Sequence, residues 1–194
     1  MLKRTLLPAL IATALLTSCQ KNMPPVASAD APTAGATTDK AQAPAKAEKI
    51  KWLTIEQAAA RIKEEPRKVV IDVYTDWCGW CKKMDKSTFT DPEVAALINK
   101  HYYAVKLDAE GQEPITLNGH TYTFKPEYRS HELAVALLNG QMSYPTTVYL
   151  DEKFNMLAPV PGYLDAKNFS KILRYFGEDH HKQMDFKAYD KQSK

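Results

Sequence analysis

The hydrophobic pattern of residues 50–176 changes its period several times, and each change marks the expected boundary of a structural element. β-Branched and aromatic residues fill Lys68–Tyr74, which predicts a buried central strand, and Tyr102–Asp108 predicts the next strand. Thr146–Asp151 and Met156–Val160 predict two further strands joined by a short turn. We expect these strands to belong to the sheet of one domain.

Apolar residues at helical spacing predict helices between these strands. Thr54 followed by Gln57 is a capping-box signal for a first helix, which Pro66 ends. Asp91-Pro92-Glu93 supplies an N-cap, a proline at the first helical position and an acid in the first turn. The other expected helices are about 78–87, 131–139, 165–176 and, in the polar extension 177–194, a short one at 186–191.

The order helix, strand, helix, strand, helix, strand, strand, helix predicts an α/β fold with a central mixed β-sheet flanked by helices. One stretch, about 111–140, interrupts this order. Asn118-Gly119 lies there between two alternating runs, which is a type I′ hairpin signal, and Gly140 ends the helix that follows. We therefore expect an inserted hairpin and helix before the third predicted strand.

The first 18 residues have the order of a bacterial export signal. Met1–Arg4 is positively charged, and Leu6–Leu16 is apolar but too short to span a bilayer comfortably. Leu16-Thr-Ser-Cys19 resembles a lipobox, in which the cysteine is lipidated and becomes the new N-terminus after cleavage. The alternative is an ordinary secretory signal with an incidental cysteine. The first interpretation predicts a lipoprotein anchored to a bacterial membrane through Cys19, and Gln20 favours the outer membrane.

Residues 19–49 are rich in Ala, Pro, Thr and Lys without apolar periodicity, which predicts a disordered tether. Removing residues 1–18 takes away Lys3 and Arg4 and no acid, so the formal charge falls from +3 to +1. The charge therefore gives no indication of a nucleic-acid partner. An extracytoplasmic, periplasmic location is one in which disulfides persist.

Asp76–Lys83 holds the two remaining cysteines in the order Cys-Gly-Trp-Cys. Cys78 and Cys81 lie one turn apart if the second half of the motif is helical, close enough to form and break a disulfide. At the helix N-terminus, the Cys78 thiolate would face unpaired N–H groups and the positive end of the helix dipole. Cys81 would be more shielded. The motif thus suggests Cys78 as the attacking thiol and Cys81 as the resolving thiol.

Half of a zinc site and an inert structural disulfide are the alternatives for this motif. A structural zinc site needs four ligands, and the sequence contains only one C-x-x-C. The histidines are scattered along the chain at His101, His120, His131, His180 and His181. We therefore expect no metal and no organic cofactor, with the dithiol itself as the redox group.

Over roughly residues 50–176 the chain resembles the thioredoxin-fold thiol–disulfide oxidoreductases. Trp77–Lys82 resembles the family's W-C-G-P-C-K, with tryptophan at the proline position. Asp72, six residues before the first cysteine, matches a buried acid, and Lys106 matches the lysine that faces it. Tyr144–Thr146 resembles the cis-proline loop, and Gly162 the glycine before the final helix. The segment 82–94 is closer to the bacterial branch that includes the C-terminal periplasmic domain of the transmembrane disulfide reductase.

The resemblance implies roles for these residues. A buried Asp72 would take a proton from Cys81 through water, with Lys106 as its partner. The alternatives are a solvated strand-end acid and a surface lysine, and the alternation along the strand does not decide between them. A cis bond before Pro145 would expose the Tyr144 backbone for pairing with an extended substrate. The implied substrate-binding residues are Trp77, Gly79, Trp80, Tyr144, Pro145 and Thr146.

These observations predict an extracytoplasmic enzyme that exchanges disulfides with protein substrates and receives electrons from an upstream donor, such as a transmembrane disulfide reductase. The Gly79 and Asp72/Lys106 pattern favours a reductant. A dithiol oxidase or isomerase is the alternative within the same class, because the dipeptide between the cysteines sets the reduction potential. A third alternative is a binding module that docks a partner through the insertion at 111–140 and keeps a static disulfide.

Overall fold

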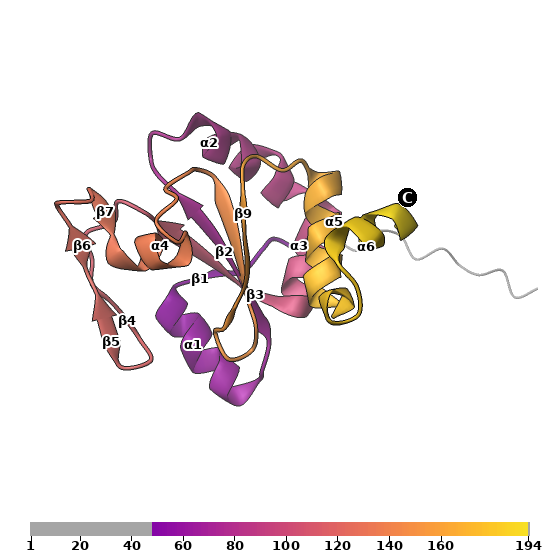
Figure 1. The fold of residues 1–194 in the computed structure, drawn as a ribbon, viewed down its shortest axis with the longest axis horizontal. Helices are drawn as coiled ribbons and strands as arrows, with labels where there is room; N and C mark the ends of the chain where they lie inside the picture. Colours follow the sequence, from indigo (N-terminus) through magenta and orange to yellow (C-terminus); the bar gives the residue numbers. More distant parts are fainter. Residues whose placement is uncertain (1–47, 194) are drawn as a thin grey trace, which may run out of the picture. The chain divides into compact units, whose positions relative to one another are not determined.

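The computed structural model describes residues 48–193 (Figure 1). The predicted signal peptide at 1–18, the lipidation site Cys19 and nearly all of the predicted tether at 19–49 lie outside the described residues. Within residues 48–193, every helix is too short or too polar to cross a membrane.

A five-stranded sheet with the order β1-β3-β2-β8-β9 forms the centre of the domain. Both β1 and β2 run parallel to β3, whereas β8 is antiparallel to β2 and to β9. The predicted mixed sheet is therefore confirmed. The strands are β1 Trp52–Leu53, β2 Lys68–Tyr74, β3 Tyr102–Asp108, β8 Thr146–Leu150 and β9 Met156–Pro161.

Helices cover both faces of this sheet, as predicted. Val70 and Tyr149 pack on one face against α3, α5 and the buried side of α2. Val69, Ile71 and Val73 pack on the other face against α1 and α4. Because both faces are covered, β2 is buried over nearly its whole length. The helices are α1 Ile55–Glu64, α2 Gly79–Lys86, α3 Pro92–His101, α4 Glu132–Leu137, α5 Ala166–Gly177 and α6 Phe186–Gln192.

The helix starts follow the predicted capping chemistry. Thr54 and Gln57 form a reciprocal capping box at α1, with backbone–side-chain distances of 3.0 and 3.2 Å. At α3, the Asp91 carboxylate accepts hydrogen bonds from the N–H groups of Glu93 and Val94, at 2.9 and 3.1 Å. These caps satisfy N–H groups that have no partner within the helix.

We expect Asp91→Ala to lower the free energy of unfolding by about 1 kcal/mol, because two helix N–H groups lose their acceptor. Urea denaturation measures this loss. Asp91→Asn keeps an acceptor at the same place and should retain most of the stability. Equal losses in both variants would contradict the capping role.

The insertion forms the predicted hairpin between β4, Ile115–Leu117, and β5, His120–Tyr122. Asn118 and Gly119 both have positive φ angles, 52° and 80°, as a type I′ turn requires. A second small sheet, β6 Phe124–Lys125 with β7 Ser130–His131, was not predicted. The α4 helix is shorter than the predicted 131–139: the His131 side chain caps its start from outside the helix, and the helix ends at Leu137.

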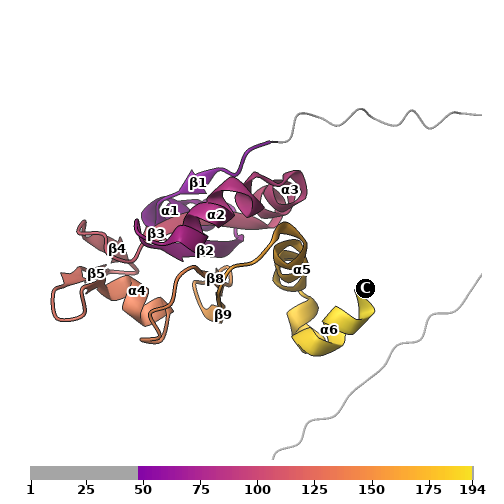
Figure 2. The same cartoon turned by 90° about the horizontal axis from the view of Figure 1, so that it is seen from above.

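The last residues extend the domain core. The helix α6 confirms the short helix predicted at 186–191, and Tyr189 from α6 is buried beside Tyr175 of α5. A 3₁₀ helix, His180–Lys182, joins α5 to α6. In both Figure 1 and Figure 2 the insertion and these C-terminal helices lie on opposite sides of the central sheet.

Candidate functional site

The cysteine pair lies where the central strand ends and the next helix begins. Cys78 is the N-cap of α2, which Figure 1 shows directly above the arrowhead of β2. Cys78 and Cys81 form a disulfide, with their Cα atoms 5.3 Å apart. The backbone N–H of Cys81 donates a hydrogen bond to the Cys78 sulfur at 3.1 Å. This N–H group has no acceptor within the helix and is directed at the Cys78 sulfur instead. A donor in this position stabilises a thiolate on Cys78.

Access to the sulfurs is narrow. Cys78 is 4% exposed and Cys81 is 1% exposed, so the difference in shielding between them has the expected direction but is small. The flanking tryptophans are open to solvent, with 66% of Trp77 and 56% of Trp80 exposed. The nearly buried Cys78 is therefore preceded and followed in the motif by exposed indole rings that a reacting partner can contact.

Trp77 and Trp80 belong to two separate aromatic contacts. The Trp77 indole N–H donates to the Glu110 carboxylate at 3.0 Å, and its ring lies edge-on to Tyr144 at 5.8 Å. The Trp80 ring lies 5.3 Å from that of Tyr163. We call Trp77, Trp80, Tyr144 and Tyr163 the aromatic rim. Sequence reasoning missed Glu110 and Tyr163, and the only available signal was that Tyr163 follows Gly162 directly.

The loop before β8 has the geometry that the resemblance implied. The Tyr144–Pro145 peptide bond is cis. The Thr146 hydroxyl donates to the Ser143 carbonyl at 2.8 Å, and the Gly162 N–H donates to the Pro145 carbonyl at the same distance. Within residues 48–193, the Tyr144 backbone forms no hydrogen bond, so its polar groups are available to an extended ligand.

A buried acid lies on the α2 side of the sheet. Asp72 is 2% exposed, and its Oδ2 accepts a hydrogen bond from the Lys106 ammonium at 2.7 Å. Lys106 is its register partner on β3 and also pairs with Asp85 of α2. The Lys106 ammonium lies 5.0 to 5.1 Å from the ring centres of Trp52, Tyr74 and Phe89. Asp72 is therefore an interior acid rather than a solvated one, and Lys106 is its partner.

Burial dominates the electrostatics of this pair. It raises the pKa of Asp72 by more than Lys106 lowers it. Burial alone would lower the pKa of Lys106, but attraction to Asp72 and Asp85 leaves that pKa raised. The Asp72 Oδ1 is buried and has no hydrogen-bond partner among the described residues. An unused acceptor on a carboxyl with a raised pKa is a suitable proton acceptor.

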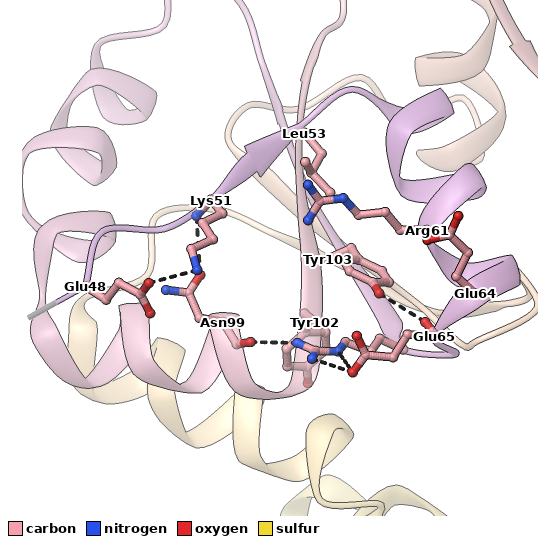
Figure 3. A pocket seen from close by; sticks show the side chains of 10 residues that line it. Glu48, Lys51, Leu53, Arg61, Glu64, Glu65, Asn99, Tyr102 and Tyr103 are labelled. Atoms are coloured by element: carbon pink, nitrogen blue, oxygen red, sulfur yellow. Dashed lines mark hydrogen bonds and ion pairs between the residues drawn. The ribbon is translucent and has the colours of Figure 1, made fainter.

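Two other features of the domain could in principle form a functional site, namely a metal-binding cluster and a surface pocket. Among residues 48–193, no group of three or more His, Cys, Asp and Glu side chains could hold a metal ion. A pocket of about 500 Å³ lies near the start of β2, at the end of the sheet away from the cysteines (Figure 3). Its charges largely satisfy one another: Arg67 pairs with Glu65 and donates to the Asn99 carbonyl, and Lys51 pairs with Glu48. The cysteine pair is therefore the stronger candidate for the functional site.

In a mixed sheet of this order, a cysteine pair at the start of the helix after the central strand defines the class of thioredoxin-fold thiol–disulfide oxidoreductases. The chain belongs to the Thioredoxin-like domain family, whose model matches residues 55–177. The family resemblance inferred from the sequence is thereby confirmed.

Curated bacterial proteins are similar to this chain. The thiol:disulfide interchange protein DsbD of Citrobacter koseri is 30% identical over 143 residues, which cover 72% of this chain and 22% of that protein. DsbD of Escherichia coli K12 is 29% identical over 123 residues, which cover 62% of this chain and 18% of that protein. The chain thus spans about a fifth of the length of these relatives.

Solved structures agree with the fold. The DsbH oxidoreductase superposes with a TM-score of 0.52 at 16% identity, covering 73% of this chain and 93% of its own. A thioredoxin from Thermus thermophilus superposes with a TM-score of 0.50 at 22% identity, covering 69% of this chain and 97% of its own. At these identities the likeness supports the thioredoxin-like fold alone.

Proposed function

We propose that the protein is an extracytoplasmic thiol–disulfide oxidoreductase that reduces disulfides of protein substrates. The observation that carries this proposal is the disulfide of Cys78 and Cys81 at the N-terminus of α2, with a helix N–H group directed at the Cys78 sulfur. Cys78 is the nucleophile of the first step and Cys81 is the nucleophile of the second, and no cofactor takes part.

In the reduced protein, the Cys78 thiolate attacks one sulfur of a substrate disulfide. The substrate S–S bond breaks, one substrate thiolate leaves, and a mixed disulfide joins Cys78 to the substrate. Cys81 then loses its proton to Asp72 through water, and its thiolate attacks the Cys78 sulfur. The second substrate thiolate leaves and the Cys78–Cys81 disulfide forms. Two electrons have passed to the substrate, and a dithiol donor must restore the reduced protein.

Reduction is the proposed direction because Gly79 and the Asp72/Lys106 pair resemble those of thioredoxin. The proposed donor is a membrane-embedded disulfide reductase of the DsbD kind. The alternative within the class is a dithiol oxidase or isomerase. The reduction potential separates these possibilities, since thioredoxin has about −270 mV and the oxidant DsbA about −120 mV.

The aromatic rim is the proposed docking site for substrates. We expect Trp80→Ala to raise KM for a protein disulfide about tenfold with little change in kcat, because the exposed ring supplies binding area beside Cys78 but takes no part in bond exchange. Insulin reduction at varied substrate concentration measures both constants. Phe186→Ala, which removes an exposed ring from the C-terminal extension, is the control. A fall in kcat at unchanged KM would contradict the docking role.

Anchoring through Cys19 is part of the proposal, supported by the lipobox-like sequence that ends at this residue. We expect Cys19→Ser to move the protein from the membrane fraction to the soluble periplasmic fraction, because the lipid attachment site is lost. Fractionation followed by immunoblotting measures this, with Cys78→Ser as a control that should remain in the membrane fraction. Retention of Cys19→Ser in the membrane would contradict a lipid anchor.

A binding module with a static disulfide is the second candidate. The observation in its favour is that the segments flanking the insertion contact the site, since Glu110, just before it, and Tyr144, a few residues after it, both contact Trp77. Thiol titration before and after treatment with reduced thioredoxin separates the candidates. The proposed enzyme gains two free thiols, whereas a static disulfide resists.

A further inference from the structure

We infer that the preferred partners of this protein carry acidic side chains next to their reactive cysteines, and that an exposed group of lysines on α2 recognises them. This inference rests on the proposed function and names the chemistry of its substrate. The group consists of Lys82, Lys83 and Lys86, and we call it the lysine patch.

The lysine patch is an excess of positive charge that the domain does not neutralise. All three side chains are exposed on a helix of only eight residues. Asp85 is the one acid on this helix, and it is paired with Lys106. None of the three lysines forms an ion pair with any residue in the described part of the chain, although Lys51, Lys68 and several others do.

The Lys83 ammonium lies at the aromatic rim. Its ammonium lies 4.8 Å from the Trp80 ring centre and 4.9 Å from that of Tyr163. Contacts with the two rings restrict the side chain without cancelling its charge. Binding of a carboxylate to this ammonium therefore costs less conformational entropy than binding to a freely moving lysine would, because the Lys83 side chain is already restricted.

The position of the patch links it to the reaction. Because Cys78 is 4% exposed at the start of α2, a partner sulfur must approach over the N-terminal end of this helix. The residues that flank the partner cysteine then lie near Trp80 and Lys83. Around Trp77 the charges have the other sign, because Asp76 is exposed and Glu110 accepts a hydrogen bond from the Trp77 indole. This polarity favours partners whose acidic residues lie on the α2 side.

Two disulfide-bonded peptides, identical except for two glutamates or two lysines beside one cysteine, test the inference. We expect the reduced protein to react about tenfold faster with the glutamate peptide at an ionic strength of about 0.01 M, and at nearly equal rates at about 1 M. The triple variant K82Q/K83Q/K86Q should remove the preference at low salt. The control variant K167Q/K187Q/K191Q changes three other exposed, unpaired lysines and should keep it.

Equal rates with both peptides in the unchanged protein would overturn the inference while leaving the proposed function intact. It would also be overturned if the triple variant kept the preference but lost binding to phosphatidylglycerol vesicles, which would make the patch a lipid-binding site. Absence of exchange with either peptide would instead contradict the proposed function. In that case, tryptophan fluorescence of the oxidised protein, titrated with serine-substituted peptides, still measures whether the acidic peptide binds more tightly.

Discussion

Replacing Cys81 with serine is expected to leave substrate proteins covalently attached to this protein. The Cys78 thiolate can still attack a substrate disulfide, but the thiol that would release the mixed disulfide is missing. Residues 48–193 contain no cysteine besides Cys78 and Cys81, so this part of the chain has no other thiol to replace Cys81. Non-reducing electrophoresis of periplasmic extracts should show adducts that disappear on reduction.

Cys78→Ser is the matched control, since it removes one sulfur from the same disulfide. It should form no adducts, and its rate of insulin reduction should fall by at least about a thousandfold, because the reaction has lost its nucleophile. Identical behaviour of the two variants, without adducts in either, would contradict the assignment of attacking and resolving thiols.

Asp72→Asn is expected to slow release of the mixed disulfide by about a hundredfold, because Cys81 loses its proton acceptor. The Asp72 carboxyl is buried, has an oxygen without a hydrogen-bond partner among residues 48–193, and has a raised pKa. Single-turnover kinetics should show that the mixed disulfide forms at nearly the normal rate and then accumulates. Asp76→Asn changes an exposed acid of the same motif. It should neither slow release of the mixed disulfide nor cause the mixed disulfide to accumulate. Unchanged release in Asp72→Asn would exclude this carboxyl as the base.

The same substitution should change the pH dependence of stability. The folded-state pKa of Asp72 is raised, so the folded protein favours the protonated carboxyl. This contribution to stability is fully present below the unfolded-state pKa and is lost as pH rises through the folded-state pKa. Between about pH 4 and pH 8 the wild type should therefore lose more free energy of unfolding than Asp72→Asn does, as urea denaturation at the two pH values measures. If the free energies of unfolding of the two proteins changed in parallel with pH, the raised pKa of Asp72 would be contradicted.

Local signals in the sequence predicted most of the elements that position the site. The run Lys68–Tyr74 is β2 with the same bounds, and the caps at Thr54 and Asp91 start the helices as expected. These features depend on residues close in sequence. In contrast, β1 has only two residues and exists through its pairing with β3, so no periodicity could predict it.

The surroundings of the cysteines were harder to predict because they come from distant segments. Asp85, Glu110 and Tyr163 contact the predicted site residues only after folding brings separate elements together. The burial of Asp72 was also undecidable from alternation, since apolar neighbours on both faces of β2 are buried. The resemblance to thioredoxin-fold proteins supplied the pairing of Asp72 with Lys106, and the structure shows the contact.

Equilibration of the purified protein with glutathione buffers, followed by thiol alkylation, tests the central claim most directly. We predict one reversible two-electron transition in which Cys78 and Cys81 become reactive together, with a midpoint nearer to about −270 mV than to −120 mV. A midpoint near −120 mV would contradict the proposed direction. A disulfide that shows no reversible transition would contradict the claim that this pair exchanges electrons with other proteins.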